Sequence, residues 1–569
     1  MSFFRVKNWP SYVPIVEVAR DYRHEDFGHD VVAGIVVGVV TVPQAIAYAF
    51  LAGLPAQAGL YACLVPMVIY AVFGSSRQLV VGPVAIAALM VAATIAEYAP
   101  AYSNHYIGIS TILCLQVGCF LWLLRVFQMG GIVNLLSHPV ITGFVNAAAF
   151  LIIISQIPAF TGITVNGPSD PFEKVIELIF AIESFNPVAL IIGIGSFLVL
   201  WVVRRYGALV IPGATRDHPI SRVGPMLIAI ISTVLVATLG LDIDTVGYVP
   251  AGLPDLTIPP FDPALWLDLA PASAMIALVA YVESYTIGTT LAARQRKRVN
   301  SHQELIALGA ANLGAAFTGA YPVAGSFSRS SVNYAAGART PVSSLVCACV
   351  IVITLLWLTP LFEYLPHAAL GAIIMISVGG LINFRSIREH WYFYHQDVYT
   401  HFITFGAVLF FGVEVGLIAG VAISVVMFVR RSSSPNIAVV GRLGSSAHFR
   451  NVERHQVETF AHVTAIRVDE NLYFANANQV ENRILKILER HAETKQVVLV
   501  CSAINFIDTS GLEMLHRINH NLDKVGIKLH LSDVKGPVMD QLESAKFPLE
   551  LSGKIFLTTD QAMRDLDGS

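Results

Sequence analysis

Residues 31–72 contain no Lys, Arg, Asp or Glu, and this stretch restricts the folds that are open to the chain. A soluble globular protein carries about 25% charged residues, whereas this chain of 569 residues has 13%. A larger soluble core does not explain the deficit, because single cores stop growing at roughly 250–300 residues. The sequence therefore predicts a polytopic helical membrane protein.

Apolar stretches that approach the length needed to cross a bilayer, about 20 residues, recur through residues 31–431. We expect about fourteen spans, two of them short. Residues 172–185 carry several acidic side chains and are predicted to lie at the membrane interface instead. The candidate spans are residues 31–51, 57–73, 83–97, 107–127, 137–157, 187–202, 223–240, 272–292, 303–319, 326–337, 342–359, 366–383, 400–412 and 414–429.

Lys and Arg residues collect in alternate loops, and this bias sets the expected orientation. The large basic clusters, such as 294–298, fall on the side of both termini when the number of spans is even. The longest opposite loop, 241–270, contains five Asp and no Lys or Arg. We expect a multi-pass protein of the cell inner (plasma) membrane with cytoplasmic termini. Residues 1–30 are predicted to be a cytoplasmic segment without a cleaved signal peptide.

The pattern changes after Arg431. We expect the transport domain to span 31–431, a linker at 432–445 and a cytoplasmic α/β domain at 446–569. The predicted strands are 463–468 with 471–474, 496–501 and 527–532, and the predicted helices are 476–491, 510–524 and 535–543.

Several function classes receive no support from composition or motifs. Net charge −3 gives no indication of a nucleic-acid partner, and a phosphate-binding Gly-rich motif is absent from the sequence. The six cysteines have no metal-binding spacing. We therefore expect no enzyme, no metal and no cofactor.

Two places inside the apolar sequence interrupt helices with the same three residues, Pro83-Val84-Ala85 and Pro322-Val323-Ala324. Gln44 lies 39 residues before Pro83, and Glu283 lies 39 residues before Pro322. Matching interruptions in two halves are typical of an inverted repeat. The two short helices would then aim their N-termini at one another near the midplane, where free N–H groups bind an anion. Two proline kinks that serve only packing are the alternative.

Polar residues around these interruptions are candidates for function. A charged Glu283 in mid-span costs about 2.5–3.5 kcal/mol on insertion scales, so we expect it to take up a proton during transport; a permanently protonated or paired structural Glu is the alternative. Arg329 supplies either a positive field near the anion or charge balance for Glu283. Gln44 and Tyr48 line the same cavity or form helix–helix hydrogen bonds.

The motifs resemble those of the SulP family of anion permeases and exchangers over nearly the whole chain. The stretch from Pro43 through Gln44 and Tyr48 to Pro55 is close to the family signature. The run from Phe73 to Pro83 and the stretch from Asn312 to Asn333 also match. The resemblance implies a seven-plus-seven inverted repeat with two half-helices, a core that moves against a gate in an elevator-like manner, and a homodimer.

By position, the resemblance implies a substrate site between the third and tenth spans. The implied substrate-binding residues are Gln44, Tyr48, Pro83, Val84, Ala85, Ser326, Phe327, Ser328 and Arg329, with Glu283 as the proton-coupling residue. The Gly-Ser-Phe-Ser-Arg-Ser run with Glu283 is similar to the proton-coupled sulfate type. Ile287 stands where the sodium-coupled bicarbonate type has Thr. Proton-coupled sulfate uptake is therefore favoured, and a bicarbonate or C4-dicarboxylate transporter, an exchanger or a channel remains the alternative.

The C-terminal region resembles a STAS domain. Asp508-Thr509-Ser510-Gly511 matches the loop whose hydroxyl residue is phosphorylated in bacterial antagonists. Ser510, or Thr509, is thus a candidate for regulatory phosphorylation, and Ser510 is also a candidate N-cap. In transporters this loop is more often structural. A cytoplasmic protein partner of this domain is expected, and a sensor or scaffold role for the whole chain is a second hypothesis.

Overall fold

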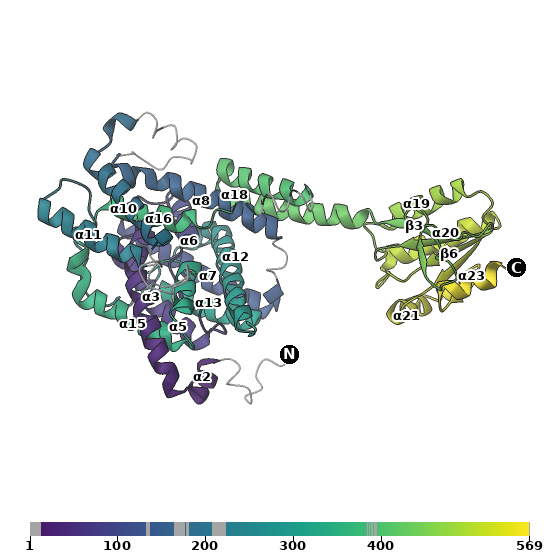
Figure 1. Ribbon diagram of the computed structural model, residues 1–569, viewed down its shortest axis with the longest axis horizontal. Helices are drawn as coiled ribbons and strands as arrows, with labels where there is room; N and C mark the ends of the chain where they lie inside the picture. Colours follow the sequence, from purple (N-terminus) through teal and green to yellow (C-terminus); the bar gives the residue numbers. More distant parts are fainter. Residues whose placement is uncertain are drawn as a thin grey trace. The chain divides into compact units, whose positions relative to one another are not determined.

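The computed structural model describes residues 13–131, 137–163, 181–206, 223–383 and 395–567, together with residues 177, 385, 387 and 391. The chain divides into two compact units, Met1–Ala422 and Ile423–Ser569 (Figure 1). Each unit has its own hydrophobic core. Most of the predicted interfacial segment 172–185 lies outside the described residues.

The first unit is helical, and each predicted span coincides with a helix or a helix pair. The helices are α2 (Ile15–Asp21), α3 (His24–Leu51), α4 (Ala56–Tyr61), α5 (Val65–Phe73), α6 (Ala85–Ile95), α7 (Asn104–Val126), α8 (His138–Thr161), α10 (Pro187–Tyr206), α11 (Gly224–Leu239), α12 (Pro263–Arg294), α13 (Ser301–Ala316), α14 (Phe327–Ala335), α15 (Val342–Ile353), α16 (His367–Gly379) and α18 (His395–Ser433).

Helix lengths show which of the predicted spans can cross a bilayer alone. Within the described residues, eight helical segments are long and apolar enough, and α6, α11 and α16 are shorter apolar helices. The last two predicted spans are continuous in α18, with a break at Gly412, where φ is 86°. Glycine alone adopts this conformation without steric cost, so Gly412 separates the two helical parts.

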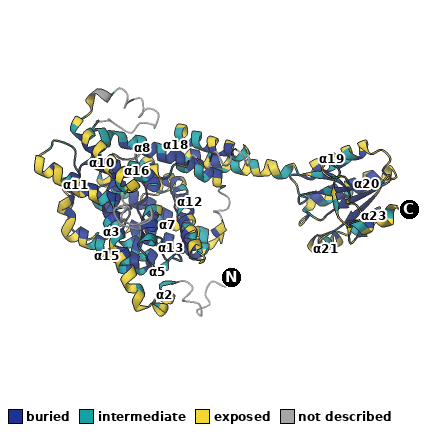
Figure 2. Cartoon of the chain, viewed as in Figure 1, coloured by how far each residue is buried: buried dark blue, intermediate teal, exposed yellow. Residues whose placement is uncertain are grey.

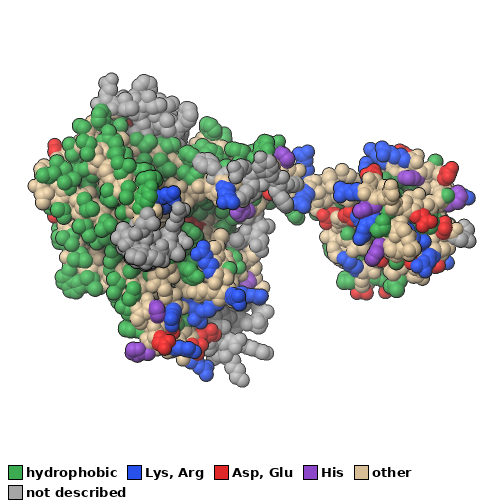
Figure 3. Space-filling model, in the orientation of Figure 1, with side chains coloured by type: hydrophobic (Ala, Val, Ile, Leu, Met, Phe, Trp, Pro, Cys, Tyr) green, Lys and Arg blue, Asp and Glu red, His purple; other side chains and the backbone are tan. Residues whose placement is uncertain are grey.

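The outer surface of this unit is apolar, as a lipid-facing surface must be. Phe410 and Phe411 of α18 are 68% and 71% exposed, and Ile191 of α10 is 70% exposed. Figure 3 shows hydrophobic side chains over a large part of the unit, whereas Figure 2 shows buried residues in its interior. Soluble monomers rarely expose so large a contiguous apolar surface. The exposed apolar surface therefore confirms the prediction of a multi-pass membrane protein.

The second unit is an α/β domain around a six-stranded sheet of order β4-β3-β5-β6-β7-β8. The strands are β3 (Ile437–Arg442), β4 (Phe449–Asn451), β5 (Val463–Val468), β6 (Gln496–Val500), β7 (Lys528–Ser532) and β8 (Ile555–Phe556). Strands β5 to β8 pair in parallel, whereas β3 is antiparallel to β4 and β5.

Both faces of this sheet are covered. The helices are α19 (Ala477–Arg490), α20 (Thr509–Lys524), α21 (Gly536–Ser544), α22 (Phe547–Glu550) and α23 (Thr559–Asp567). Ile466 and Val468 point to the core that α19, α20 and α21 complete, whereas Val463 and Ala465 point to the core of α23. This alternation follows from the two-residue period of a strand.

The predicted elements of this domain are present, with three differences. Ile437–Arg442, expected within a linker, form β3 and pair with β5, because this strand supplies Val440 to the α23 core. Residues 471–474 do not continue β5; Leu472 forms only an isolated bridge to Ile507. The short strands β4 and β8 were missed, because they are too short to show an alternating pattern.

Candidate functional site

Two short strands bring the interrupted segments together in the first unit. β1 (Val81–Gly82) and β2 (Ala324–Gly325) pair antiparallel, with Val81 opposite Gly325 and Gly82 opposite Ala324. α6 follows β1 and α14 follows β2. The two helix N-termini therefore start from one antiparallel pair and lie close together, as predicted from the paired interruptions.

The Pro-Val-Ala match itself is not in structural register. Pro83 follows β1 and precedes α6, whereas Pro322 precedes β2. Gly82 and Gly325 are the last residues of β1 and β2 and so hold equivalent positions, which are 243 residues apart (325 minus 82), whereas the prolines are separated by 239 (322 minus 83). The repeated arrangement of strand and half-helix is present, and the two prolines serve different positions in it.

One face of α14 holds the segment that leads into α6. Asn333 Nδ2 donates to the Gln78 carbonyl at 3.2 Å, and Ser330 Oγ accepts from Val80 N–H at 2.9 Å. Arg329 Nη2 donates to the Pro83 carbonyl at 2.7 Å. Arg329, Ser330 and Asn333 lie on one helical face because of their three- and four-residue spacing. The two half-helix segments are thereby fixed to each other.

Arg329 is fully buried, with 0% of its surface exposed. Besides Pro83, its guanidinium contacts Cys63 Sγ at 3.6 Å, and its Nε has no hydrogen-bond partner among the described residues. Within that part of the chain, Arg329 forms no ion pair with Glu283. Its positive charge therefore lies beside the N-terminus of α6, bound to a carbonyl rather than neutralised by a carboxylate.

Two further side chains anchor β2. Asn312 of α13 accepts from Val323 N–H at 2.9 Å and donates to the Val323 carbonyl at 3.1 Å. Ser284 Oγ accepts from Gly325 N–H at 2.7 Å. Since Ser284 is adjacent to Glu283 on α12, this hydrogen bond also fixes the position of Glu283 along α12 relative to β2.

Small apolar residues surround the start of α6. Val84, Ala87, Ala280 and Ala324 form a buried cluster that joins α6, α12 and β2. Val84 is the N-cap residue and offers no side-chain acceptor to the helix. Among the described residues, the N–H groups of Ala85 to Ala87 have no acceptor. Such bare N–H groups at a helix start attract an anion.

Polar atoms without partners lie on the helices that pack around this pair. Gln44 Oε1 and Glu283 Oε2 are buried and, in the described part of the chain, accept no hydrogen bond. Tyr48 is 6% exposed and lies within interaction range of Arg329, Ser377 and Glu283. Unpaired buried polar atoms are costly and rare, and their concentration here is typical of a site that binds a polar ligand.

The start of α14 differs from the start of α6. Ser326 is its N-cap and accepts from Arg329 N–H, while its own N–H donates to the Val80 carbonyl. Phe327 is 46% exposed, although Ser326 and Arg329 are buried. Ser328 is partly buried on the same turn. The residues predicted at the starts of α6 and α14 therefore lie in one region, around the β1–β2 pair. Phe327 is the exposed residue at the start of α14.

Sequence reasoning missed residues that position this site: Gln78, Ser284, Asn312, Ser330, Asn333 and Ser377. Five of them share one signal, which is a polar side chain inside an apolar span, whereas Gln78 lies in the loop between two predicted spans. That signal does not identify the partner, because backbone segments far apart in the sequence receive these hydrogen bonds.

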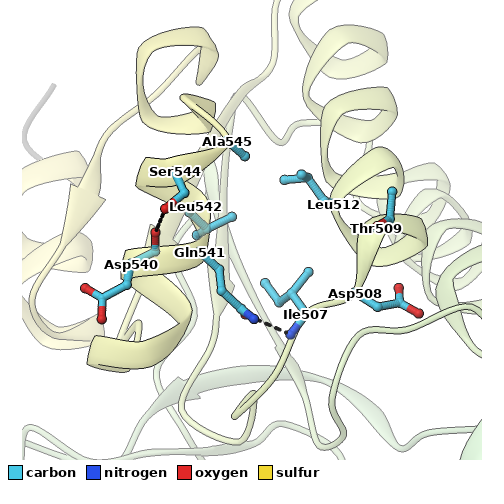
Figure 4. Close-up of a pocket in the computed structure, with 9 residues that line it drawn as sticks. All are labelled: Ile507, Asp508, Thr509, Leu512, Asp540, Gln541, Leu542, Ser544 and Ala545. Carbon is cyan, nitrogen blue, oxygen red and sulfur yellow. Dashed lines mark hydrogen bonds between the residues drawn. The ribbon is translucent and has the colours of Figure 1, made fainter.

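In the second unit, the predicted phosphorylation loop begins α20. Asp508 is the N-cap, since Oδ1 accepts from Gly511 N–H at 2.9 Å, and the prediction of Ser510 as N-cap was wrong. The Asp508 carboxylate reaches the third residue of the helix, as capping requires. Thr509 is exposed and lines a cavity of about 480 Å³ between α20 and α21 (Figure 4).

The fold and these arrangements define a class: helical membrane transporters with two half-helices at a paired-strand crossing and a C-terminal STAS domain. Residues 27–404 match the sulfate permease family, and residues 454–562 match the STAS domain. The chain therefore belongs to the sulfate permease family. Its relatives are transporters and not enzymes.

Relatives extend over nearly the whole chain. Probable sulfate transporter 4.2 of Arabidopsis thaliana is 34% identical over 570 residues, which cover 97% of this chain and 83% of that protein. High affinity sulfate transporter 2 of Stylosanthes hamata is 31% identical and covers 97% of this chain and 85% of its own length.

Solved structures share the fold. The murine Solute Carrier 26 family member A9 anion transporter in the inward-facing state matches with a TM-score of 0.91 and 22% identity, over 100% of this chain and 96% of that chain. The transmembrane domain of the cyanobacterium bicarbonate transporter BicA matches with a TM-score of 0.60 and 21% identity, over 70% of this chain and 98% of that chain.

Proposed function

We propose that this chain is a secondary active transporter that takes up sulfate together with protons. The observation that carries the proposal is the β1–β2 pair, which joins the bare N-terminus of α6 to the buried Arg329 of α14. A doubly charged oxyanion suits such a site, because it interacts with helix dipoles and with a guanidinium at once. The relatives named as sulfate transporters support this choice of anion.

Gln44, Tyr48, Pro83, Val84, Ala85, Ser326, Phe327, Ser328 and Arg329 are the proposed substrate-binding residues. The N–H groups that follow Val84 bind the anion, and Arg329 supplies positive charge from behind the Pro83 carbonyl. Gln44 and Tyr48 complete the wall on α3. The anion thus interacts mainly with groups that keep their charge or dipole at every pH of the cell.

Glu283 is the proposed proton carrier. Its Oε2 has no hydrogen-bond partner in the described residues, so a proton is not held there by a neighbouring group. It follows Ala280 by one helical turn, and Ala280 packs against Val84 at the start of α6. If the Glu283 carboxyl group is neutral when sulfate is bound and ionised when the site is empty, each sulfate ion crosses the membrane together with a proton.

The movement is proposed to be elevator-like, with the part that carries α6 and α14 sliding against the remaining helices. The protein is proposed to lie in the inner (plasma) membrane as a homodimer with cytoplasmic termini. For the second unit, phosphorylation at Thr509 is proposed before Ser510, because Thr509 is exposed and Ser510 is partly buried. A cytoplasmic protein partner is proposed for the same domain.

Proteoliposomes test the transport proposal. Uptake of labelled sulfate should rise with an inward proton gradient, and Glu283→Gln should abolish that rise while leaving sulfate binding measurable. Glu97→Gln is the matched control, because Glu97 is exposed and lies past the far end of α6. Uptake that ignores the gradient in both the unmodified protein and Glu283→Gln would refute proton coupling.

A competition assay against labelled sulfate distinguishes sulfate from the alternative anions. Unlabelled sulfate should displace labelled sulfate at lower concentration than bicarbonate, fumarate or chloride. A bicarbonate or C4-dicarboxylate transporter would reverse that order. An exchanger would require anion on the opposite side of the membrane, and a channel would give currents far above transporter turnover.

A further inference from the structure

A second group of cations lies in the first unit, at the end where α2 is found. Arg77, Lys297 and Arg298 line a cavity of about 430 Å³ formed by α2, the loop between α5 and β1, and the loop after α12. This volume is within the range of small-ligand sites. Figure 3 shows Lys and Arg side chains gathered at this end of the unit.

Acidic neighbours do not neutralise this group. Glu17 lines the same cavity, and among the described residues it forms no ion pair with any of the three cations. Asp26 is bound to Arg339 at 2.9 Å. Glu304 lies buried behind the loop, where its carboxylate accepts from Tyr70 Oη and from Ser75.

The cations crowd one another. Partial burial and the neighbouring Arg77 guanidinium lower the pKa of Lys297, against the opposing effect of Asp26. Like charges brought this close destabilise each other unless an anion lies between them. The arrangement therefore favours a bound anion.

A buried hydroxyl in the same cavity has no partner. Ser76 is 4% exposed and lines the cavity, and its Oγ forms no hydrogen bond in the described part of the chain. Buried hydroxyl groups nearly always find a partner. This observation is independent of the basic side chains, and it adds a donor to a cavity that already contains three cations.

The walls of the cavity are fixed before any ligand binds. Ser75 is held by Glu304 and accepts from Asn300 N–H at 3.1 Å, and Gln303 Nε2 donates to the Phe73 carbonyl at 2.7 Å. The loop after α12 is closed by Lys297 N–H, which donates to the Ala292 carbonyl. A preformed site loses little conformational freedom on binding.

We infer that this cavity binds a phosphate group, either of a soluble phosphate compound or of an anionic lipid headgroup, separately from the transported anion. The three cations and the Ser76 hydroxyl are the kinds of group that bind the oxygen atoms of a phosphate. The cavity is also connected to the transport site. The loop that lines the cavity continues through Gln78 into β1, and Asn333 of α14 donates a hydrogen bond to the Gln78 carbonyl. On the other side, the cavity is lined by the end of α12, the helix that carries Glu283. Occupancy therefore regulates the half-helix pair.

Binding to the purified full-length chain in detergent tests the inference. The probes are inorganic pyrophosphate and dioctanoyl phosphatidic acid, with dioctanoyl phosphatidylcholine as the headgroup control. We expect a raised unfolding temperature, and a dissociation constant weakened about tenfold or more in Arg77→Gln/Lys297→Gln, because charge-assisted hydrogen bonds are lost. Ser76→Ala should weaken binding by a smaller factor without changing the charge.

The matched control is Arg20→Gln/Arg296→Gln. It removes the same charge from the same end of the unit, and neither residue lines the cavity. Should Arg77→Gln/Lys297→Gln not fold, Lys297→Gln/Arg298→Gln replaces it, because both of its side chains are exposed. If pyrophosphate binds the unmodified protein and not the cavity variant, the ligand is a soluble phosphate compound. If only phosphatidic acid binds, the ligand is a lipid headgroup. Binding of neither probe, or equal weakening in cavity and control variants, overturns the inference.

Discussion

The two half-helices begin at the same pair of strands, yet their first turns have opposite chemistry. α6 starts at Val84 with no side-chain cap and continues through alanines, so its N–H groups are bare. α14 starts at Ser326, which caps it, and it carries Arg329 and Ser330 toward the neighbouring segment. One half presents backbone dipoles to the site, whereas the other supplies charge and holds the pair together.

The difference teaches that an inverted repeat keeps backbone geometry and divides the side-chain roles. Both halves have a strand followed by a helix start, and this crossing forms the proposed anion site between the helices. In the proposed site one half supplies the cation, which is Arg329 of α14. The variants below test this division, starting from the largest expected effect.

Arg329→Ala should have the largest effect. It removes the charge and both contacts of the guanidinium, to Pro83 and to Cys63, and one charged hydrogen bond contributes about 1.5–3 kcal/mol. We expect sulfate uptake to fall by about 100-fold, with Arg329→Lys restoring only part, because an ammonium group does not reach both partners. Proteoliposome uptake measures this, and size-exclusion chromatography checks folding. Unchanged uptake in Arg329→Ala would show that the cation has no role in binding.

Alanine substitutions at two glycines, Gly82 and Gly325, should distinguish an effect on sulfate affinity from an effect on protein stability. A Cβ at Gly82 would lie 3.1 Å from Arg329 Nη1, whereas a Cβ at Gly325 would lie 2.8 Å from Leu79 Cδ1. Gly82→Ala should displace the guanidinium and weaken apparent sulfate affinity about tenfold. Gly325→Ala should lower the unfolding temperature, at a cost of about 1–3 kcal/mol for overpacking, and keep affinity. Equal loss of affinity in both variants would contradict the division of roles.

Val84→Ser tests the bare start of α6 directly. A serine at this N-cap position accepts an N–H group that the anion otherwise uses, and such caps contribute about 1 kcal/mol. Apparent sulfate affinity should fall about fivefold while the unfolding temperature rises. Val84→Ala is the control, because it offers no acceptor. Increased affinity in Val84→Ser would mean that a hydroxyl group binds the anion better than the backbone does.

Ser326→Ala should have the smallest effect. The Ser326–Arg329 hydrogen bond is 3.5 Å long, so the hydroxyl is a weak cap. We expect a loss of about 0.5–1 kcal/mol of stability, seen as a small decrease in unfolding temperature, and a fall in uptake of about two- to threefold, because the hydroxyl is one of several proposed contacts to the anion. Unchanged uptake would remove Ser326 from the proposed substrate-binding residues.

Much of the membrane fold was predictable, because apolar length and charge-free stretches are local properties. The predicted spans coincide with the helices α3 to α18, although α4 and α5 break one span and Gly412 divides another helix. The predicted linker was wrong over 437–442, since pairing with β5 depends on a strand much later in the sequence. Likewise, the capping role of Asp508 rather than Ser510 depended on where α20 begins.

The sequence by itself determined that the chain is lipid-solvated, that two helices are interrupted, and that a separate α/β domain follows. Periodicity, charge distribution and motif resemblance carry that information, because each acts over neighbouring residues. Only the tertiary structure decided that β1 and β2 pair, in an antiparallel register that the Pro-Val-Ala match does not show. It alone decided that Arg329 binds Pro83 and not Glu283, because hydrogen bonds between distant segments depend on distances that no local pattern encodes.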